Sequence, residues 1–247
     1  FAMKLNHLFI LPLAFIACSS PDENSEYEQI LEDQNVAEEQ EQKENELFMN
    51  WIPDTSGLSI FRFELDTNQH YRGLYSDWRS DKFYFCGSLG GVGMGDLSME
   101  EPTTTHLYNA DSLHLRDIEL YGDKVFIMSI GHPGKIIEGS GSDLTDPEAW
   151  RTRLFVVDTN VFMDGIDFWG NGKGLGYGDP LDGFHFVLRT DNKGQAWGRL
   201  SAVDLPQVMK DEAGFAASGT GVVCIGEGVG YVAWGGEKAR VFKTTDF

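Results

Sequence analysis

The feature that most constrains the fold of this 247-residue chain is a strand–turn–strand unit that recurs about every 45 residues. Leu74 and Ile118 occupy equivalent positions 44 residues apart, and Ile166 follows 48 residues later. The four copies comprise residues 73–87, 117–129, 165–178 and 222–234. A repeat of this length built from short strands is typical of a β-propeller, whose blades are four-stranded antiparallel sheets stacked around a central channel. The sequence therefore predicts an all-β propeller with about four blades; a β-sandwich, which needs no fixed period, is the alternative.

Composition narrows the class of protein further. The chain has 29 glycines and is 41% hydrophobic, as expected for short strands joined by tight turns. Its net charge of −20 argues against a nucleic-acid partner, because phosphate recognition needs clustered Lys and Arg. Much of that charge lies in residues 19–46, where eleven Asp and Glu accompany a single Lys. Such a segment buries too little apolar surface to offset its conformational entropy, so we predict a disordered acidic tether over residues 18–46.

The first residues have the pattern of an export signal. Lys4 precedes a short apolar run over residues 8–17, and that run is too short to span a bilayer. Residues 15–18, Phe-Ile-Ala-Cys, resemble a bacterial lipobox, in which the cysteine is lipidated. We therefore expect a lipoprotein signal peptide over residues 1–17, lipidation of Cys18 and a lipid-anchored protein of the bacterial cell envelope, at the outer membrane or cell surface. An ordinary cleaved secretory signal is the alternative. The remaining residues, 47–247, form the predicted propeller domain.

Two cysteines remain outside the leader. Cys86 and Cys224 have neither a C-x-x-C pattern nor metal-ligand spacing. Free cysteines are usually buried, so we expect both thiols to be unpaired. A disulfide between these two cysteines is the alternative, and the sequence does not decide between the two.

Residues 189–197 resemble an Asp box, a hairpin motif written S/T-x-D-x-G-x-T-W. Thr190 fills the first position, Asn192 stands in place of the Asp, and Gly194 and Trp197 match. A short polar side chain can hydrogen-bond the backbone of its own turn, and glycine adopts a positive φ at little cost. Trp197 is expected to bury its ring, with the indole N–H available to an acceptor. We interpret this box as structural.

Several further phrases extend the resemblance over roughly residues 58–247. They include Tyr71–Leu74, Leu115–Glu119, Tyr177–Gly183, Phe215–Thr220 and Ala239–Asp246. Together with the box they resemble bacterial Asp-box (BNR) propellers similar to the photosystem II assembly-factor domain. The resemblance implies an incomplete N-terminal portion of a longer propeller, in which a strand over residues 59–65 closes the ring. It also implies a protein-binding or complex-assembly role, although relatives often carry the label oxidoreductase.

Three polar residues recur at one point of the repeat. Arg72, Arg116 and Asp164 each lie two residues before the apolar residue that marks their unit. Because the first strand of each blade lines the channel, these side chains could gather at one mouth and bind a protein partner or a small anion. The alternative is an internal Arg–Asp network that holds the blades together, such as Arg116 with Asp164.

The sequence offers no constellation of catalytic residues. Sialidases share the Asp-box propeller, but their chemistry needs an arginine cluster, a nucleophile and an acid/base carboxyl at a defined separation. The histidines do not occur at zinc-ligand spacing, and the glycine-rich runs do not complete a dinucleotide-binding motif. We therefore expect no metal and no cofactor. The favoured function is a non-enzymatic, envelope-anchored binding module with an unknown protein partner; a secreted sialidase-like glycosidase or glycan-binding protein is the alternative.

Overall fold

The structure is a computed structural model that describes residues 62–65, 68–77, 79–96, 98, 101–107, 113–216 and 219–246, with isolated positions between 32 and 60. The chain divides into two compact units, residues 1–60 and residues 61–247. Cys18 and the predicted signal peptide lie outside the described residues, as does most of the tether. Among the residues that are described, no helix has the length and apolar character needed to cross a membrane.

Residues 61–247 contain four antiparallel sheets whose strands pair in chain order. Blade 1 comprises β1 (Tyr71–Asp77), β2 (Lys82–Gly87), β3 (Gly91–Asp96) and β4 (Thr103–His106); blade 2 comprises β5 (Leu115–Tyr121), β6 (Lys124–Ser129), β7 (Gly134–Ser140) and β8 (Arg151–Val156). Blade 3 comprises β9 (Met163–Phe168), β10 (Gly174–Leu181), β11 (Phe184–Thr190) and β12 (Gly198–Arg199); blade 4 comprises β13 (Val222–Ile225), β14 (Val229–Trp234) and β15 (Arg240–Thr244). Short 3-10 turns occupy Ser88–Gly90, Pro147–Ala149 and Ala202–Asp204.

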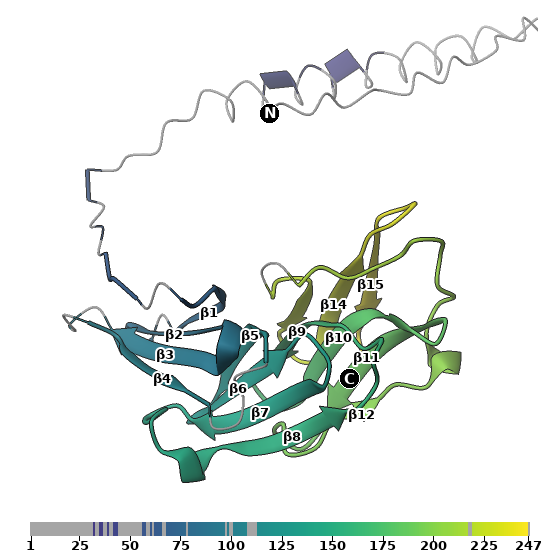
Figure 1. Cartoon of the computed structure of the whole chain (residues 1–247). Helices are drawn as coiled ribbons and strands as arrows, with labels where there is room; N and C mark the ends of the chain where they lie inside the picture. Colours follow the sequence, from purple (N-terminus) through teal and green to yellow (C-terminus); the bar gives the residue numbers. More distant parts are fainter. Residues whose placement is uncertain are drawn as a thin grey trace, which may run out of the picture. The chain divides into compact units, whose positions relative to one another are not determined.

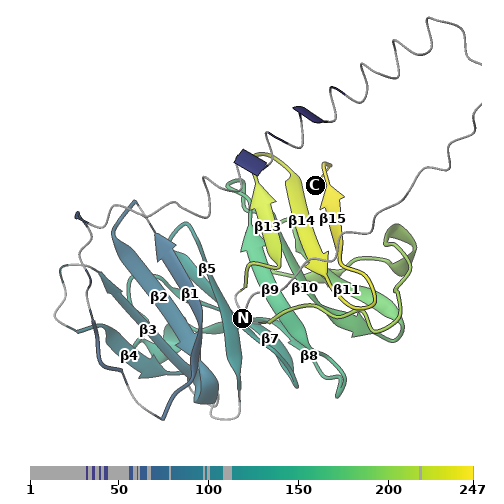
Figure 2. The ribbon, with the colours of Figure 1, turned by 90° about the horizontal axis from the view of Figure 1, so that it is seen from above.

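The first strands of successive blades lie side by side. β1 contacts β5, β5 contacts β9, and β9 contacts β13, while the remaining strands of each blade extend outwards (Figures 1 and 2). The predicted strand–turn–strand units coincide with β1–β2, β5–β6, β9–β10 and β13–β14. The all-β propeller prediction is confirmed, and the repeated unit is the inner pair of strands of each blade.

The core consists of apolar layers between neighbouring blades. Ile118 and Val125 of blade 2 pack with Tyr84 of blade 1, and all three side chains are buried. A second layer joins blades 2 and 3, and a third joins blades 3 and 4 around Trp169 and Trp234. Complete burial of one large apolar side chain stabilises the fold by about 1.5–3 kcal/mol. The layers therefore supply most of the attraction between blades.

Two carboxylates bridge the inner strands, the buried Asp117 and the half-buried Asp167, and we call them the carboxylate bridges. Asp117 accepts hydrogen bonds from the backbone N–H groups of Ile118 at 3.0 Å and Ile166 at 2.7 Å. Asp167 likewise accepts from Phe168 at 2.7 Å and from Cys224 at 2.6 Å. In each pair the second donor belongs to the next blade. Burial raises the pKa of Asp117 to about 7, although both hydrogen bonds oppose that shift.

The predicted strand over residues 59–65 is wrong for the residues described there. Residues 62–65 alternate between exposed and half-buried, as the pattern suggested, but they belong to no strand. Phe63 instead packs on Phe83 of β2, with ring centroids 5.7 Å apart. Alternation indicates a chain with two different sides, whereas a strand also needs a hydrogen-bonding partner.

Both cysteines are free, which confirms the expectation of unpaired thiols. Each thiol contacts a carboxylate bridge: the Cys86 Sγ lies 3.5 Å from the carbonyl oxygen of Asp117, and the Cys224 Sγ lies 3.5 Å from that of Asp167. The two thiols thus occupy different blade interfaces. Burial raises the pKa of both thiols, which keeps them protonated.

Candidate functional site

Arg72, Arg116 and Asp164 occupy the same structural position in three blades. The pairing of β1 with β2 shifts register between Tyr71 and Gly73, so Arg72 is the extra residue of a β-bulge. Arg116 has the same place in β5, and Asp164 has it in β9. A bulge bends its strand and re-aims the side chain of the extra residue. The repeat seen in the sequence is therefore a repeated bulge at the start of the inner strand.

The bulges of blades 1 and 2 open on one cavity of about 210 Å³, which we call the basic mouth. Arg72 and Arg116 both line it. Its other lining residues are His70, Ser88, His114 and Leu115. Ser88 is held in place because its hydroxyl accepts a hydrogen bond from the backbone N–H of His70 at 2.9 Å.

Sequence reasoning missed the two histidines of the basic mouth. Each precedes its arginine by two residues, in His70-Tyr71-Arg72 and in His114-Leu115-Arg116. That repeated H-x-R spacing could have indicated that the two histidines accompany the arginines. Ser88 could not have been found in this way, because it comes from the turn that follows β2 and not from an inner strand.

The positive charge of the basic mouth has few internal partners. Arg72 is exposed, and it forms neither a hydrogen bond nor an ion pair within the described part of the chain. Arg116 donates from Nη1 to the carbonyl oxygen of Ala216 at 3.3 Å. Burial, and then the like charge of Arg72, lower the pKa of Arg116, while Asp164 opposes this shift. The Arg116 guanidinium remains charged despite this shift, because arginine titrates far above neutral pH.

Asp164 does not join the two arginines in the cavity. Its side chain is fully buried, and neither carboxyl oxygen has a hydrogen-bond partner among the described residues. Within the same residues no ion pair links it to Arg116, so the internal Arg–Asp network considered from the sequence is not formed. Burial, and then the charge of Asp179, raise the pKa of Asp164 to about 8, although Arg116 opposes this.

A segment before β13 covers Asp164, and we call residues 213–216 and 219–221 the covering segment. The backbone N–H of Gly214 donates to Asp179 Oδ1 at 2.8 Å. A Cβ on Gly214 would lie 2.0 Å from Asp164 Oδ2, and one on Gly221 would lie 1.7 Å from the Tyr177 hydroxyl. Only glycine allows the backbone to approach these side chains so closely.

The Asp-box residues form the expected hairpin in blade 3. The Thr190 hydroxyl accepts a hydrogen bond from the backbone N–H of Gly194 at 3.1 Å, and Asn192 Oδ1 accepts from Ala196 at 3.0 Å. Gly194 has φ of +75°, and a Cβ there would lie 2.3 Å from the Phe126 ring of blade 2. Trp197 is buried, but its indole nitrogen has no partner among the described residues, where the sequence analysis had anticipated an acceptor. The box thus fastens blade 3 to blade 2.

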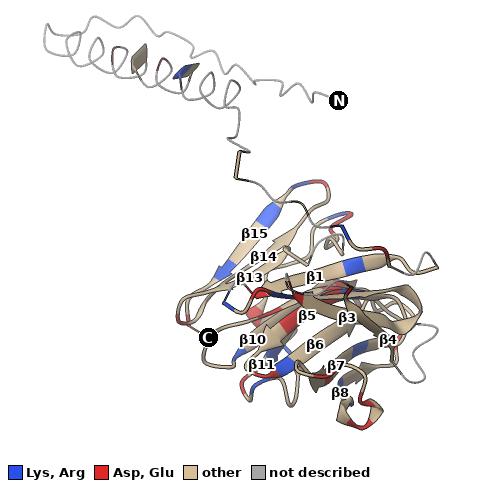
Figure 3. Ribbon diagram, turned by 90° about the vertical axis from the view of Figure 1, so that its left-hand side faces the viewer, with Lys and Arg blue, Asp and Glu red and all other residues tan. Residues whose placement is uncertain are grey.

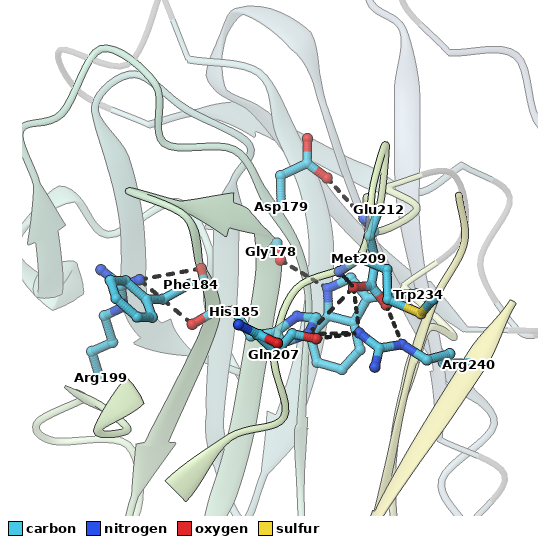
Figure 4. A network of polar contacts seen from close by, with 11 residues as sticks. Gly178, Asp179, Phe184, His185, Arg199, Gln207, Met209, Glu212, Trp234 and Arg240 are labelled. Carbon is cyan, nitrogen blue, oxygen red and sulfur yellow. Dashed lines mark hydrogen bonds and ion pairs between the residues drawn. The ribbon is translucent and has the colours of Figure 1, made fainter. Parts of the chain in front are cut away.

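A polar network joins blades 3 and 4 (Figure 4). Arg240 donates from Nε to Glu212 Oε1 at 2.8 Å, and Glu212 lies 3.4 Å from His185 Nε2. Burial lowers the pKa of His185, so the imidazole is neutral near pH 7. Burial alone would raise the pKa of Glu212, but the hydrogen bonds from Arg240 and Met209 lower it. The network links His185 of blade 3 to Arg240 of blade 4 through Glu212, and the sequence analysis did not find it.

The inner strand β1 carries Arg72, whereas β5 carries Arg116 beside the acidic residues Asp117 and Glu119. Figure 3 shows a basic segment on β1 and an acidic segment on β5. Among the described residues, no group of three or more His, Cys, Asp or Glu side chains is placed to hold a metal ion. The arrangement at the basic mouth can therefore bind an anion through guanidinium, imidazole and hydroxyl groups.

Comparison with known proteins adds evidence on the fold. No protein-family model matches the chain, and no curated protein does. Among solved structures, YCF48 from Cyanidioschyzon merolae aligns with a TM-score of 0.50 at 13% identity, over 81% of this chain and 56% of that one. A structure of YCF48 bound to D1 peptide aligns with a TM-score of 0.49 at 15% identity, over 71% and 50%. The WD40 β-propeller domain of Doa1 gives 0.40 at 10% identity, over 72% and 54%.

The chain thus spans about half the length of the solved structures that it matches. At such low identity the likeness to YCF48 is evidence for the fold alone. Together with the blades and their adjacent inner strands, it shows that residues 61–247 form a β-propeller of this kind.

Proposed function

We propose that this chain is a non-enzymatic binding module that recognises a carboxylate-bearing protein partner at the basic mouth. The observation that carries the proposal is the shared cavity of Arg72 and Arg116 at equivalent bulges. Guanidinium groups present several N–H donors in a planar fork that matches a carboxylate. An acidic side chain or a C-terminal carboxylate of the partner is the ligand group that fits this lining.

The chemistry of the cavity favours binding over the sialidase-like alternative. A sialidase-like site needs, beside its arginine cluster, a nucleophile and an acid/base carboxyl group at a defined separation. The lining residues supply guanidinium, imidazole and hydroxyl groups, and none of them carries a carboxyl group. Asp164 carries the carboxyl group that the sequence analysis placed with these arginines, and it is buried beneath the covering segment.

The test is the affinity of the whole chain for a fluorescent Glu-rich peptide, measured by anisotropy against a Gln-rich peptide of equal length. We expect the chain to prefer the Glu-rich peptide. Arg72→Ala combined with Arg116→Ala should weaken that binding about tenfold or more, as the loss of directional charged contacts does at other interfaces. Arg62→Ala is the matched control, because Arg62 is an exposed arginine outside the mouth.

Two results would contradict the proposal in different ways. If the folded double variant binds the acidic peptide as well as the parent does, the basic mouth is not the binding site. If the parent turns over sialosides, or nicotinamide or flavin substrates, and a single substitution abolishes turnover, the protein is an enzyme. Partners that the parent captures from the native envelope, and that the double variant does not, would identify the physiological ligand.

We further propose that Cys18 anchors the module to the bacterial envelope, at the outer membrane or cell surface, through the acidic tether. The support is the Phe-Ile-Ala-Cys sequence at residues 15–18, with its small residue before the cysteine. One acyl chain binds membranes only marginally, whereas two or more hold a protein firmly. Cys18→Ser should release the protein from membranes and abolish incorporation of labelled palmitate. A parent protein that takes up no palmitate would refute the anchor and leave the binding module untouched.

A further inference from the structure

Asp164 occupies the position that carries an arginine in the two preceding blades, yet its surroundings are opposite in character. Arg72 is exposed and Arg116 is half-buried, but the side chain of Asp164 is inaccessible. An ionised carboxylate in such a place needs a counter-ion or hydrogen-bond donors. The described residues provide neither to its two oxygens. The lack of partners among these residues therefore favours the neutral, protonated form of Asp164 over the carboxylate.

Charged and titratable groups approach Asp164 from each neighbouring element. Arg116 acts on it from β5, and Asp179 and Tyr177 act from β10. Gly214 of the covering segment lies against Oδ2 and leaves no room for a larger residue. Arg116 is thus the cation that acts on Asp164, and the same guanidinium lines the basic mouth.

We propose that Asp164 competes with anionic ligands for Arg116. When Asp164 is protonated, it leaves the Arg116 guanidinium to an anionic ligand. When Asp164 is ionised, it draws that guanidinium away from the basic mouth. This inference rests on the proposed function. It adds regulation: the affinity for anions falls as Asp164 loses its proton. By linkage, a bound anion favours protonated Asp164, so binding takes up a proton where the residue is half ionised.

The pH range follows from the environment of the carboxyl. Burial, with Asp179 close by, raises the pKa of Asp164 to about 8. Below that pH Asp164 is neutral and Arg116 serves the ligand. Above it the ionised carboxylate attracts Arg116, whose guanidinium contacts the same covering segment that packs on Asp164. A small change of pH just above neutrality therefore changes how tightly the mouth holds a carboxylate.

The first experiment needs no ligand. An NMR titration of the whole chain with ¹³C-labelled Asp carboxyl groups, assigned by comparison with Asp164→Asn, should give a midpoint near pH 8. Arg116→Ala should raise that midpoint, because it removes the favourable cation, and Asp179→Asn should lower it. A midpoint below pH 5, or one that Arg116→Ala leaves unchanged, would overturn the proposal.

The second experiment uses inorganic sulfate, whose charge does not change over this range. In a His70→Gln plus His114→Gln background, which removes the pocket imidazoles, sulfate affinity should fall roughly fivefold or more between pH 7 and pH 9.5, the usual lower bound for coupled sites. Asp164→Asn in that background should remove the dependence, and Asp179→Asn should move it to lower pH. Calorimetry in buffers of different ionisation enthalpy should show proton uptake near pH 8, and none in Asp164→Asn.

The outcomes separate this inference from the function on which it rests. Sulfate binding whose pH dependence is unchanged in folded Asp164→Asn overturns the competitor and leaves the anion site intact. Failure of sulfate to bind the parent at any pH, while the NMR midpoint still responds to Arg116→Ala, overturns the proposed function and the regulation with it. If Asp164→Asn does not fold, the direction in which Asp179→Asn shifts the pH dependence of sulfate binding decides. That variant keeps the contact with the covering segment, because Asn can still accept the hydrogen bond from Gly214.

Discussion

The carboxylate bridges and Asp164 are all aspartates of the inner strands, and Asp117 and Asp164 are both buried, but their environments differ. Asp117 and Asp167 each accept two backbone hydrogen bonds, one of them from the next blade. Asp164 accepts none from the described residues and lies near an arginine that faces a cavity. The difference teaches that burial alone does not mark a functional acid. The satisfied carboxylates hold blades together, and the unsatisfied one is free to respond to its surroundings.

Trp197 gives the strongest test of this comparison, because its indole nitrogen also lacks a partner while its ring is buried. If packing decides its role, Trp197→Ala should destabilise the protein by about 3–5 kcal/mol, the cost of deleting a buried aromatic side chain. Urea unfolding of the variant and of Trp197→Phe, which keeps most of the packing, would measure this. A loss below about 1 kcal/mol would contradict the packing role of Trp197, and its unsatisfied indole nitrogen would then be the better indication of what the residue does.

The carboxylate bridges should be the next most sensitive positions. Asp117→Ala leaves the N–H groups of Ile118 and Ile166 without an acceptor, and each unsatisfied buried donor costs about 1–3 kcal/mol. We therefore expect a loss of roughly 2–4 kcal/mol, with a smaller loss for Asp117→Asn, which keeps one acceptor oxygen. Equal stability of Asp117→Ala and the parent in denaturant titrations would show that the bridges are dispensable.

Asp164 should reveal itself through the pH dependence of stability. Its folded-state pKa of about 8 lies above the ordinary value of 3.8, so its contribution to stability is fully present below pH 4 and is lost as pH rises to 8. Asp164→Asn removes this loss. The stability of the variant relative to the parent should therefore rise between pH 4.5 and pH 8, and then level off. Thermal melts at several pH values would measure it, and a constant difference would contradict the assignment.

Arg72 should have the smallest effect on stability. The side chain is exposed and has no described partner, so Arg72→Ala should change the free energy of unfolding by less than about 0.5 kcal/mol. The same variant should nevertheless weaken binding of the Glu-rich peptide. A clear loss of stability would instead make Arg72 a structural residue and place it with the carboxylate bridges.

The repeat in the sequence predicted the blades well because it records local chemistry. Apolar residues on each side of a short polar turn can form a hairpin without help from distant residues, so all four inner strand pairs lie where the pattern predicted them. The Asp-box hairpin was predictable for the same reason, since its hydrogen bonds join residues at most four positions apart. The segment before residue 66 was mistaken for a strand because pairing depends on a partner that the pattern does not contain.

The sequence by itself determined the inner strands, the recurring position of Arg72, Arg116 and Asp164, and the hairpin that contains Trp197. Only the tertiary structure decided what those polar residues face. A β-bulge at each position directs two arginines into a shared cavity with His70 and His114. The covering segment, some fifty residues further along the chain, buries Asp164 without a partner among the described residues. Burial and charge depend on neighbours that are distant in sequence, so equivalent positions in a repeat can acquire opposite chemistry.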